Sequence, residues 1–243
     1  AFAKSTEDPP VARQLMSTGE RRRKARSLKL TSGLVRAPGV MTTRPVRVAV
    51  IDSGVNPAHP HVGGVAGGTA IAADGSSGGD YIDRLGHGTA VAAAIRERAP
   101  SAELFAVKVF DRRLSASIEA LVAGIGWAAA HDADLINLSL GTANPHHAIA
   151  LQSAVARAAE AGALVVAAGT QEGGAYLPGS LDGVVQVELD WACPRLVVDV
   201  VSGAGRGDTV CRASGYPRPV PGVSLDRNLK GISFAVANVT GVL

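Results

Sequence analysis

Three residues of the chain have the side chains needed for covalent catalysis, namely Asp52, His87 and Ser233. A serine hydroxyl is a poor nucleophile until an imidazole removes its proton. A carboxylate must also hold that imidazole in the correct tautomer and stabilise its charged form. Each of the three residues lies within two positions of a glycine, which lets the backbone turn sharply. Their order along the chain, Asp then His then Ser, is one known for such sets, so they predict acyl transfer by a nucleophilic serine.

Taken singly, each of these residues has an ordinary structural explanation. Asp52 could cap the turn after a strand, His87 could simply stand at the start of a helix, and Ser233 alone carries almost no information. The catalytic hypothesis depends on the three occurring together, each in its own sequence context.

The surrounding segments predict alternating strands and helices. Short β-branched apolar runs indicate buried strands, and stretches with apolar residues at helical spacing indicate helices. The expected strands cover 47–51, 104–110, 134–140, 163–168 and 184–187, and the expected helices cover 88–98, 117–131, 147–161 and a stretch that begins near Ser233. Residues 62–79 are expected to be loop, and 188–230 receives no assignment.

This alternation predicts a three-layer α/β/α fold with a mostly parallel sheet. The apolar residues are mainly Ala, Val, Leu and Ile, and only 4% of the chain is aromatic, which suits a buried sheet under Ala-rich helices. Parallel sheets place their sites at the carboxyl ends of the strands. Asp52, Phe110-Asp111, Ser139-Leu140-Gly141 and Gly169-Thr170 should therefore share one edge.

The composition excludes several classes of protein. No apolar run reaches the roughly 18 residues of a membrane helix, so no membrane span is expected. Two cysteines, Cys193 and Cys211, are too few for a disulfide scaffold and lack a zinc-type C-x-x-C spacing. Whether these two cysteines pair with each other is left open by the sequence.

The basic residues are unevenly distributed. Eleven of the 24 lysines and arginines lie in the first 47 positions, beside only three acidic residues. We expect residues 1–45 to be a basic, proline-containing extension that is solvated rather than bound to nucleic acid. Residues 46–243 are expected to form one catalytic domain.

Four stretches carry a family resemblance. VAVIDSGVNPAHP surrounds Asp52, GHGTAVAAAI surrounds His87, GISFAVANVTGVL surrounds Ser233, and a continuous central stretch runs from Ala102 to Gly141. Together they resemble the subtilisin-like serine proteases, or subtilases, from about Val48 to the end of the chain. The resemblance implies that Asp52 orients His87, that His87 is the general base and then acid, and that Ser233 attacks the scissile carbonyl.

The resemblance also implies a peptide or protein substrate and no cofactor. Subtilases bind the peptide as an extended strand between two segments, which here are Leu114-Ser115-Ala116 and Ser139-Leu140-Gly141. Many of them bind calcium, and Asp80 and Asp83 are the acidic loop residues that could do so. Because no calcium motif is present, solvated loop carboxylates are the preferred interpretation and no metal site is assigned.

Three positions depart from the family pattern. Thr170 occupies the place of the asparagine that donates to the oxyanion, Ile232 replaces the threonine before the nucleophile, and Ala237-Asn238 replaces a Pro-His pair. Losing one oxyanion donor costs roughly 100- to 1,000-fold in turnover. The prediction is a serine endopeptidase, in a narrower form a peptide-maturation protease. The alternative is a catalytically impaired pseudoprotease that binds peptides as a scaffold or regulatory module.

Two further expectations follow from the family pattern. Subtilases continue beyond the nucleophile helix, so a partner chain or a further C-terminal segment is expected to cover that helix. The resemblance favours a secreted protein, whereas the lack of a visible signal peptide leaves a cytoplasmic location open.

Overall fold

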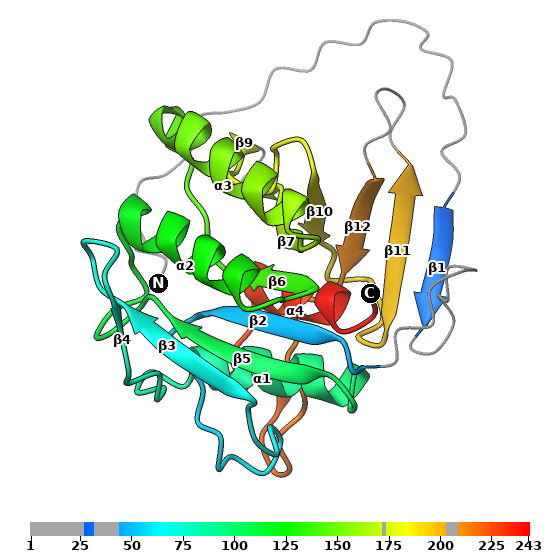
Figure 1. Ribbon diagram of the computed structural model, residues 1–243. Helices are drawn as coiled ribbons and strands as arrows, with labels where there is room; N and C mark the ends of the chain where they lie inside the picture. Colours follow the sequence, from blue (N-terminus) through cyan, green and yellow to red (C-terminus); the bar gives the residue numbers. More distant parts are fainter. Residues whose placement is uncertain (1–26, 32–43, 172–173, 203–208) are drawn as a thin grey trace, which may run out of the picture.

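The chain folds around one large sheet in the computed structural model, which describes residues 27–31, 44–171, 174–202 and 209–243 (Figure 1). Ten strands of the described part form this sheet. They are β1 (Ser27–Thr31), β2 (Arg47–Asp52), β3 (Gly67–Ile71), β4 (Ser77–Gly78), β5 (Glu103–Lys108), β6 (Leu135–Leu138), β7 (Leu164–Ala168), β10 (Val184–Leu189), β11 (Val197–Ser202) and β12 (Thr209–Ala213). A separate hairpin joins β8 (Thr170–Gln171) to β9 (Gly174–Ala175).

The sheet is parallel except at its two edges. Its strand order is β1-β11-β12-β10-β7-β6-β2-β5-β3-β4. The strands from β12 to β3 run parallel, whereas β1, β11 and β12 pair antiparallel at one edge and β4 pairs antiparallel with β3 at the other. This arrangement confirms the predicted mostly parallel sheet.

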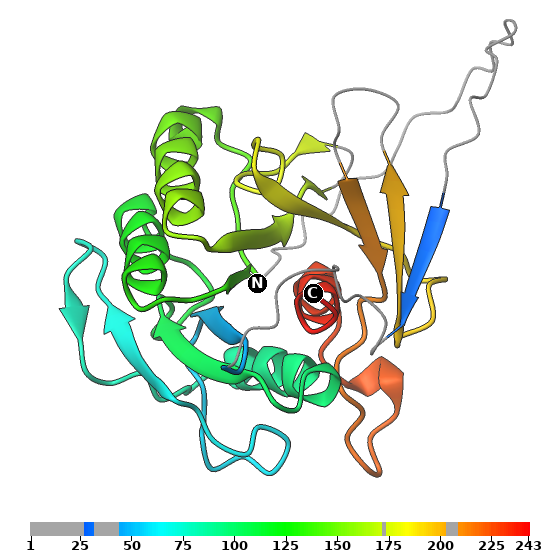
Figure 2. The ribbon, with the colours of Figure 1, turned by 45° about the vertical axis from the view of Figure 1, so that its right-hand side comes forward.

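Helices cover both faces of the sheet, which gives the predicted three layers. The helices are α1 (His87–Arg98), α2 (Ile118–Ala130), α3 (Ala148–Glu160) and α4 (Ile232–Thr240), with short 3₁₀ turns η1 (Pro145–His147) and η2 (Leu225–Arg227). Helices α2 and α3 pack together on one face, and α1 and α4 pack together on the other. Figure 2 shows α4 nearly end-on beside α1.

Alternation along the central strands explains this division. In β2, Ala49 and Ile51 join the core under α2 and α3, while Val48 and Val50 join the core under α1. Successive side chains of a strand point to opposite faces, so a strand covered on both sides reads as an unbroken apolar run. The buried run before Asp52 has this form.

The connections of the sheet predict where a site should form. From β2 the chain crosses to β3 on one side, whereas from β6 it crosses to β7 on the other. Ligands of open α/β sheets bind in the crevice between strands whose connections diverge in this way. That crevice lies between the carboxyl ends of β2 and β6, where Asp52 and Ser139 stand.

The expectation that residues 62–79 are loop is wrong, because β3 and β4 lie within them. The glycines that suggested a loop serve close packing instead. A Cβ at Gly68 would collide with the Ala106 carbonyl oxygen and approach the Tyr81 ring at 2.9 Å. Glycine within a strand often marks such a close approach.

The ends of the chain add further elements. Residues 27–31, within the expected extension, pair with β11, and the unassigned region 188–230 contributes β11 and β12. Residues 1–26 and 32–43, which hold eight of the eleven lysines and arginines of the first 47 positions, lie outside the described residues. Among the helices that the structure describes, none is long and apolar enough to cross a membrane.

Candidate active site

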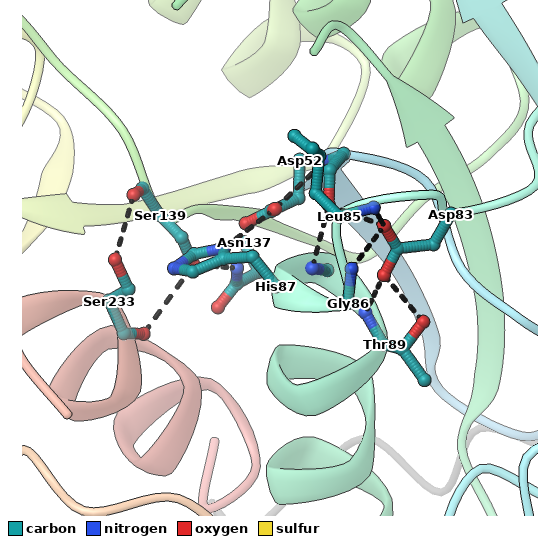
Figure 3. A network of polar contacts seen from close by, with 11 residues as sticks. Asp52, Asp83, Leu85, Gly86, His87, Thr89, Asn137, Ser139 and Ser233 are labelled. Atoms are coloured by element: carbon teal, nitrogen blue, oxygen red, sulfur yellow. Dashed lines mark hydrogen bonds and ion pairs between the residues drawn. The ribbon is translucent and has the colours of Figure 1, made fainter. Parts of the chain in front are cut away.

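Asp52 and His87 form a directly hydrogen-bonded pair. Asp52 is the last residue of β2 and His87 the first of α1, and Asp52 Oδ1 lies 2.7 Å from His87 Nδ1 (Figure 3). The Asp52 side chain is fully buried, whereas 14% of the His87 side chain is exposed. The backbone N–H of Ser53 donates to the same carboxylate oxygen at 2.7 Å, which fixes its orientation. A buried carboxylate held in this way selects the tautomer that leaves Nε2 free to accept a proton.

The pair also sets the protonation behaviour of the imidazole. Burial lowers the pKa of His87, but the hydrogen bond that its ring donates to Asp52 and the charges of Asp52 and Asp83 outweigh burial and hold the pKa above its ordinary value. A histidine with a raised pKa is a stronger proton acceptor once it is neutral. His87 can therefore serve as a general base above that pKa.

Ser233 stands in the first turn of α4, after Gly231. Gly231 has φ of 147°, a conformation that L side chains rarely adopt, and its N–H donates to the Gly215 carbonyl at 2.9 Å. The first N–H groups of a helix lack partners within the helix, so this turn presents donors as well as the hydroxyl. Ser233 and His87 line the same cleft, of about 490 Å³.

The Ser233 hydroxyl points to the strand edge rather than to the imidazole. It donates to the Ser139 carbonyl at 3.2 Å, and the Ser139 hydroxyl donates to the Ser233 carbonyl at 3.4 Å. Asn137 supports this contact, with its Nδ2 donating to Ser139 Oγ at 2.8 Å and its Oδ1 lying 3.0 Å from Thr240 Oγ1. The end of β6 and helix α4 are thus joined by polar side chains, and Ser233 must rotate to meet His87.

The two segments expected to hold a peptide both line the cleft. Leu114, Ser115 and Ala116 form one wall, and Ser139, Leu140 and Gly141 form another. Further apolar side chains of the lining are Phe110, Ile118, Leu121 and Tyr176. The cleft therefore takes its lining from both expected segments and from these apolar side chains.

The positions that depart from the family pattern lie in different places relative to the cleft. Ile232 lines the cleft, but Thr170, which lies in β8, is not among the described residues that line it. Asn238 is buried in α4, and its Nδ2 donates to the carbonyls of Ser214 and Tyr216 at 2.9 and 3.1 Å. Asn238 therefore ties the nucleophile helix to the segment after β12.

Tyr176 is a cleft residue that the sequence analysis missed. Its ring covers Gly141, because a Cβ there would lie 2.6 Å from Tyr176 Cε1. Burial raises the pKa of the Tyr176 hydroxyl. The sequence offers no local signal for this role, because Tyr176 reaches Gly141 only when the chain around Leu177 pairs with Thr142.

The acidic loop before α1 is engaged with the protein. Asp80 accepts from the Ile82 N–H at 3.0 Å and pairs with Arg84 at 2.6 Å, while Asp83 accepts hydrogen bonds from Ser53 and from the start of α1. Among the described residues, no group of three or more His, Cys, Asp or Glu side chains could hold a metal ion.

The cysteines lie away from the cleft lining. Cys211 is a buried thiol in β12, and burial raises its pKa to about 11. The Cys193 thiol donates to the Val197 carbonyl at 3.3 Å. A thiol with so high a pKa is a poor nucleophile at neutral pH, so Cys211 is a packing residue.

Comparisons with known proteins show the family and the fold of the chain. The subtilase family model matches residues 43–188. The chain is 32% identical over 231 residues to subtilisin E of Bacillus subtilis, an alignment that covers 90% of this chain and 58% of that protein, and equally similar to a subtilisin of Bacillus pumilus, of which it covers 81%. A thermostable alkaline protease of Halalkalibacterium halodurans is 40% identical over 152 residues, which are 58% of this chain and 40% of that protein.

A solved structure shows the same fold. It is a cold-adapted subtilisin-like serine proteinase with a TM-score of 0.61 and 23% sequence identity, covering 82% of this chain and 73% of its own. The chain spans 58% of the length of subtilisin E. Membership of the family therefore does not by itself assign the activity of that longer protein to this chain. On the extent of the family match and the identity to the subtilisins, the chain belongs to the subtilase family.

Proposed function

We propose that the chain is a serine endopeptidase that cleaves peptide bonds through an acyl-enzyme on Ser233. The observation that carries the proposal is the 2.7 Å bond between His87 and buried Asp52, in a cleft that also holds the Ser233 hydroxyl. An imidazole oriented by a carboxylate beside a serine at the start of a helix has the parts required for acyl transfer.

The proposed reaction proceeds in two halves. Ser233 Oγ rotates from the Ser139 carbonyl, attacks the scissile carbonyl carbon and loses its proton to His87 Nε2. His87 then protonates the leaving amine as the C–N bond breaks, which leaves an ester on Ser233. Water attacks the ester, His87 accepts its proton, and the acid leaves as Ser233 regains a proton. Asp52 remains ionised throughout.

Stabilisation of the oxyanion is the weakest part of the proposed machinery. The N–H groups at the start of α4 supply donors near Ser233. Thr170 lies outside the cleft lining, and Ile232 has no side-chain donor. The proposal is therefore a slow enzyme, in its narrower form a protease dedicated to maturing one peptide, for which slow turnover is tolerable.

Covalent labelling tests the proposed function directly. The full chain is incubated with a serine-reactive peptidyl phosphonate, and the adduct is located by mass spectrometry. We expect one adduct, on Ser233, together with hydrolysis of unfolded protein or peptide substrates. A chain that takes up no phosphonate and cuts no peptide would refute the assignment. With a cognate peptide, product masses would separate hydrolysis from transfer of the acyl group to an amine.

A pseudoprotease that binds peptides without cutting them is the second candidate. It is favoured by the Ser233 hydroxyl, which donates to the Ser139 carbonyl and has no hydrogen bond to His87 in the described part of the chain. Peptide binding that is unchanged in Ser233→Ala, with no hydrolysis by the parent protein, would support this candidate.

Tyr176→Ala should change substrate preference. Removing the ring that covers Gly141 enlarges the cleft beside that residue, so larger substrate side chains gain apolar contacts there. We expect kcat/KM for large over small residues at this subsite to rise roughly ten-fold or more. The measurement is a peptide library digested by both proteins. Tyr176→Phe keeps the ring and should keep the parent's preference, and an unchanged preference in Tyr176→Ala would contradict the role.

Thr170→Asn should raise turnover if the oxyanion site lacks only one side-chain donor. Thr170 lies outside the cleft lining, so the prediction requires the longer asparagine side chain to reach into the cleft. There its amide N–H would bind the oxyanion more strongly than the ground-state carbonyl, and kcat should rise by up to about 100-fold with little change in KM. Steady-state kinetics on one peptide measure both constants. Thr170→Ser is the matched control without an amide. A fall in kcat would show that this side chain belongs to a rearranged site.

A further inference from the structure

A second carboxylate, Asp83, lies beside the catalytic pair and is not used by the mechanism. It is four residues before His87 and is about half buried between the turn after β2 and the start of α1. Figure 3 shows Asp83 beside Gly86 and Thr89, on the side of His87 away from Ser233. Asp83 is not among the residues that line the cleft.

The Asp83 carboxylate accepts five hydrogen bonds. Oδ1 accepts from Ser53 Oγ and from the N–H groups of Leu85 and Gly86, each at 2.9 Å. Oδ2 accepts from the Thr89 N–H at 2.9 Å and from the Thr89 hydroxyl at 2.6 Å. Burial raises the pKa of Asp83, but these hydrogen bonds outweigh burial and hold the pKa below its ordinary value. Asp83 is therefore ionised at neutral pH.

These bonds replace the missing cap of α1. The N-cap residue, Gly86, has no side chain, so the first N–H groups of the helix need acceptors from elsewhere. Asp83 accepts from Thr89, and Ser53 Oγ accepts from the Gly88 N–H at 2.9 Å. A negative charge at a helix N-terminus is also favourable because it opposes the helix dipole. The cap therefore holds the turn of helix that begins with His87.

Ser53 connects this cap to the catalytic carboxylate. Its hydroxyl donates to Asp83 and accepts from Gly88, while its N–H donates to Asp52 Oδ1. A Cβ at Gly88 would collide with the Gly54 carbonyl oxygen, so the turn after β2 lies directly on the helix start. Both members of the hydrogen-bonded pair, Asp52 and His87, are thus held by one network.

We propose that Asp83 is a positioning residue for His87, because its carboxylate caps α1 and, through Ser53, joins the helix start to the turn that follows Asp52. The proposal rests on the proposed serine endopeptidase activity for its kinetic consequences only. Its charge should also favour the protonated imidazole. Of the other charged or titratable groups near His87, Asp52 from β2 bonds to its ring, and Lys230, His147 and Tyr176 line the same cleft.

Asp83→Asn in the full chain tests the role. The substitution removes the charge and turns one acceptor oxygen into a donor that faces the N–H groups of α1. We expect kcat to fall on the order of ten- to a hundred-fold, with a smaller change in KM, because His87 loses its fixed place. We also expect the acidic limb of the kcat/KM profile to move to lower pH, a shift that a structural role alone would not cause.

Asp80→Asn is the matched control, since it removes the same charge from the same loop. Asp80 is exposed and bonds to Ile82 and Arg84 rather than to α1, so the profile and kcat should match the parent's. Ser53→Ala keeps the Asp83 charge but removes the hydroxyl that bonds to Asp83 and to the Gly88 N–H. For that variant we expect a lower kcat with the acidic limb little moved.

Two results would overturn the proposal. One is a folded Asp83→Asn variant with the pH profile and kcat of Asp80→Asn. The other, which decides the matter if Asp83→Asn does not fold, is Ser53→Ala with the parent's kcat. NMR titration of the His87 ring in the full chain reports the same shift without turnover. A parent that is not labelled by the phosphonate would therefore refute the proposed function and still leave the positioning role measurable.

Discussion

Ser233→Ala is expected to abolish phosphonate labelling and to lower kcat by about a million-fold. Removing the nucleophile of a Ser-His-Asp set lowers kcat about as much as removing all three residues. Without the serine hydroxyl, the histidine and aspartate have no nucleophile to activate. The residual rate would come from peptide binding and from the N–H groups at the start of α4. Because the alanine fits the space of the serine, peptide affinity should be nearly unchanged.

The measurements for this prediction are single-turnover hydrolysis of one peptide and intact-protein mass spectrometry. Ser153→Ala is the matched control, because Ser153 lies exposed on α3 and outside the cleft lining. It should be labelled and should hydrolyse peptide like the parent. Activity that persists in Ser233→Ala would mean that another residue is the nucleophile, and the proposed mechanism would be wrong.

Local sequence predicted the elements whose signals are themselves local. The apolar run before Asp52 forms the expected buried strand, and the Ala-rich stretch after His87 forms the expected helix. Because β2 ends at Asp52, the place of Asp52 at the carboxyl edge of the sheet follows from the parallel sheet. The pairing of Asp52 with His87 is implied by the family resemblance rather than by the pattern of strands and helices.

Features that depend on tertiary contacts could not be predicted in this way. Strand β3 contains Gly67 and Gly68, and glycine is a poor strand former. Gly68 is needed there because β5 and Tyr81 approach its backbone closely, which only the fold reveals. The cap by Asp83 is equally hidden, because its partner Ser53 lies 30 positions away. In sequence, Asp83 is only one acid in a polar loop.

The same reasoning applies to the nucleophile helix. Asn137 is a single polar residue within an apolar strand, and Thr240 follows Asn238 in an otherwise apolar stretch of α4; that contrast is a signal that buried partners exist. It does not say which residues they join. The structure shows that they meet each other and, through Ser139, the nucleophile. How Ser233 is held could therefore be learned only from the fold.

Asp52→Asn should lower kcat by about 10⁴-fold while leaving the fold intact. An asparagine has the same shape, but it has no charge to stabilise the imidazolium that forms when Ser233 is deprotonated. Its amide can also donate to His87 Nδ1, which would put the remaining proton on Nε2, where it blocks general-base catalysis. Losing both the hydrogen bond to the carboxylate and its charge should lower the pKa of His87, so the residual activity should extend to lower pH.

The Asp52→Asn substitution should have little cost in folding stability. Its Oδ2 is buried and has no hydrogen-bond partner within the described part of the chain, so burial of the charge is compensated mainly through Oδ1. Neutralising the side chain should therefore leave stability unchanged or raise it, even as activity falls. Thermal unfolding and a pH series of kcat measure the two effects separately.

Asp134→Asn is the matched control, because Asp134 precedes β6 at the opposite end of the strands. It accepts from the Arg47 N–H at 2.8 Å and pairs with Arg44, so its loss should lower stability modestly and leave kcat unchanged. If Asp52→Asn retained the parent's kcat, the carboxylate would be a structural residue of the turn. The imidazole would then have to be oriented by the capped start of α1 alone.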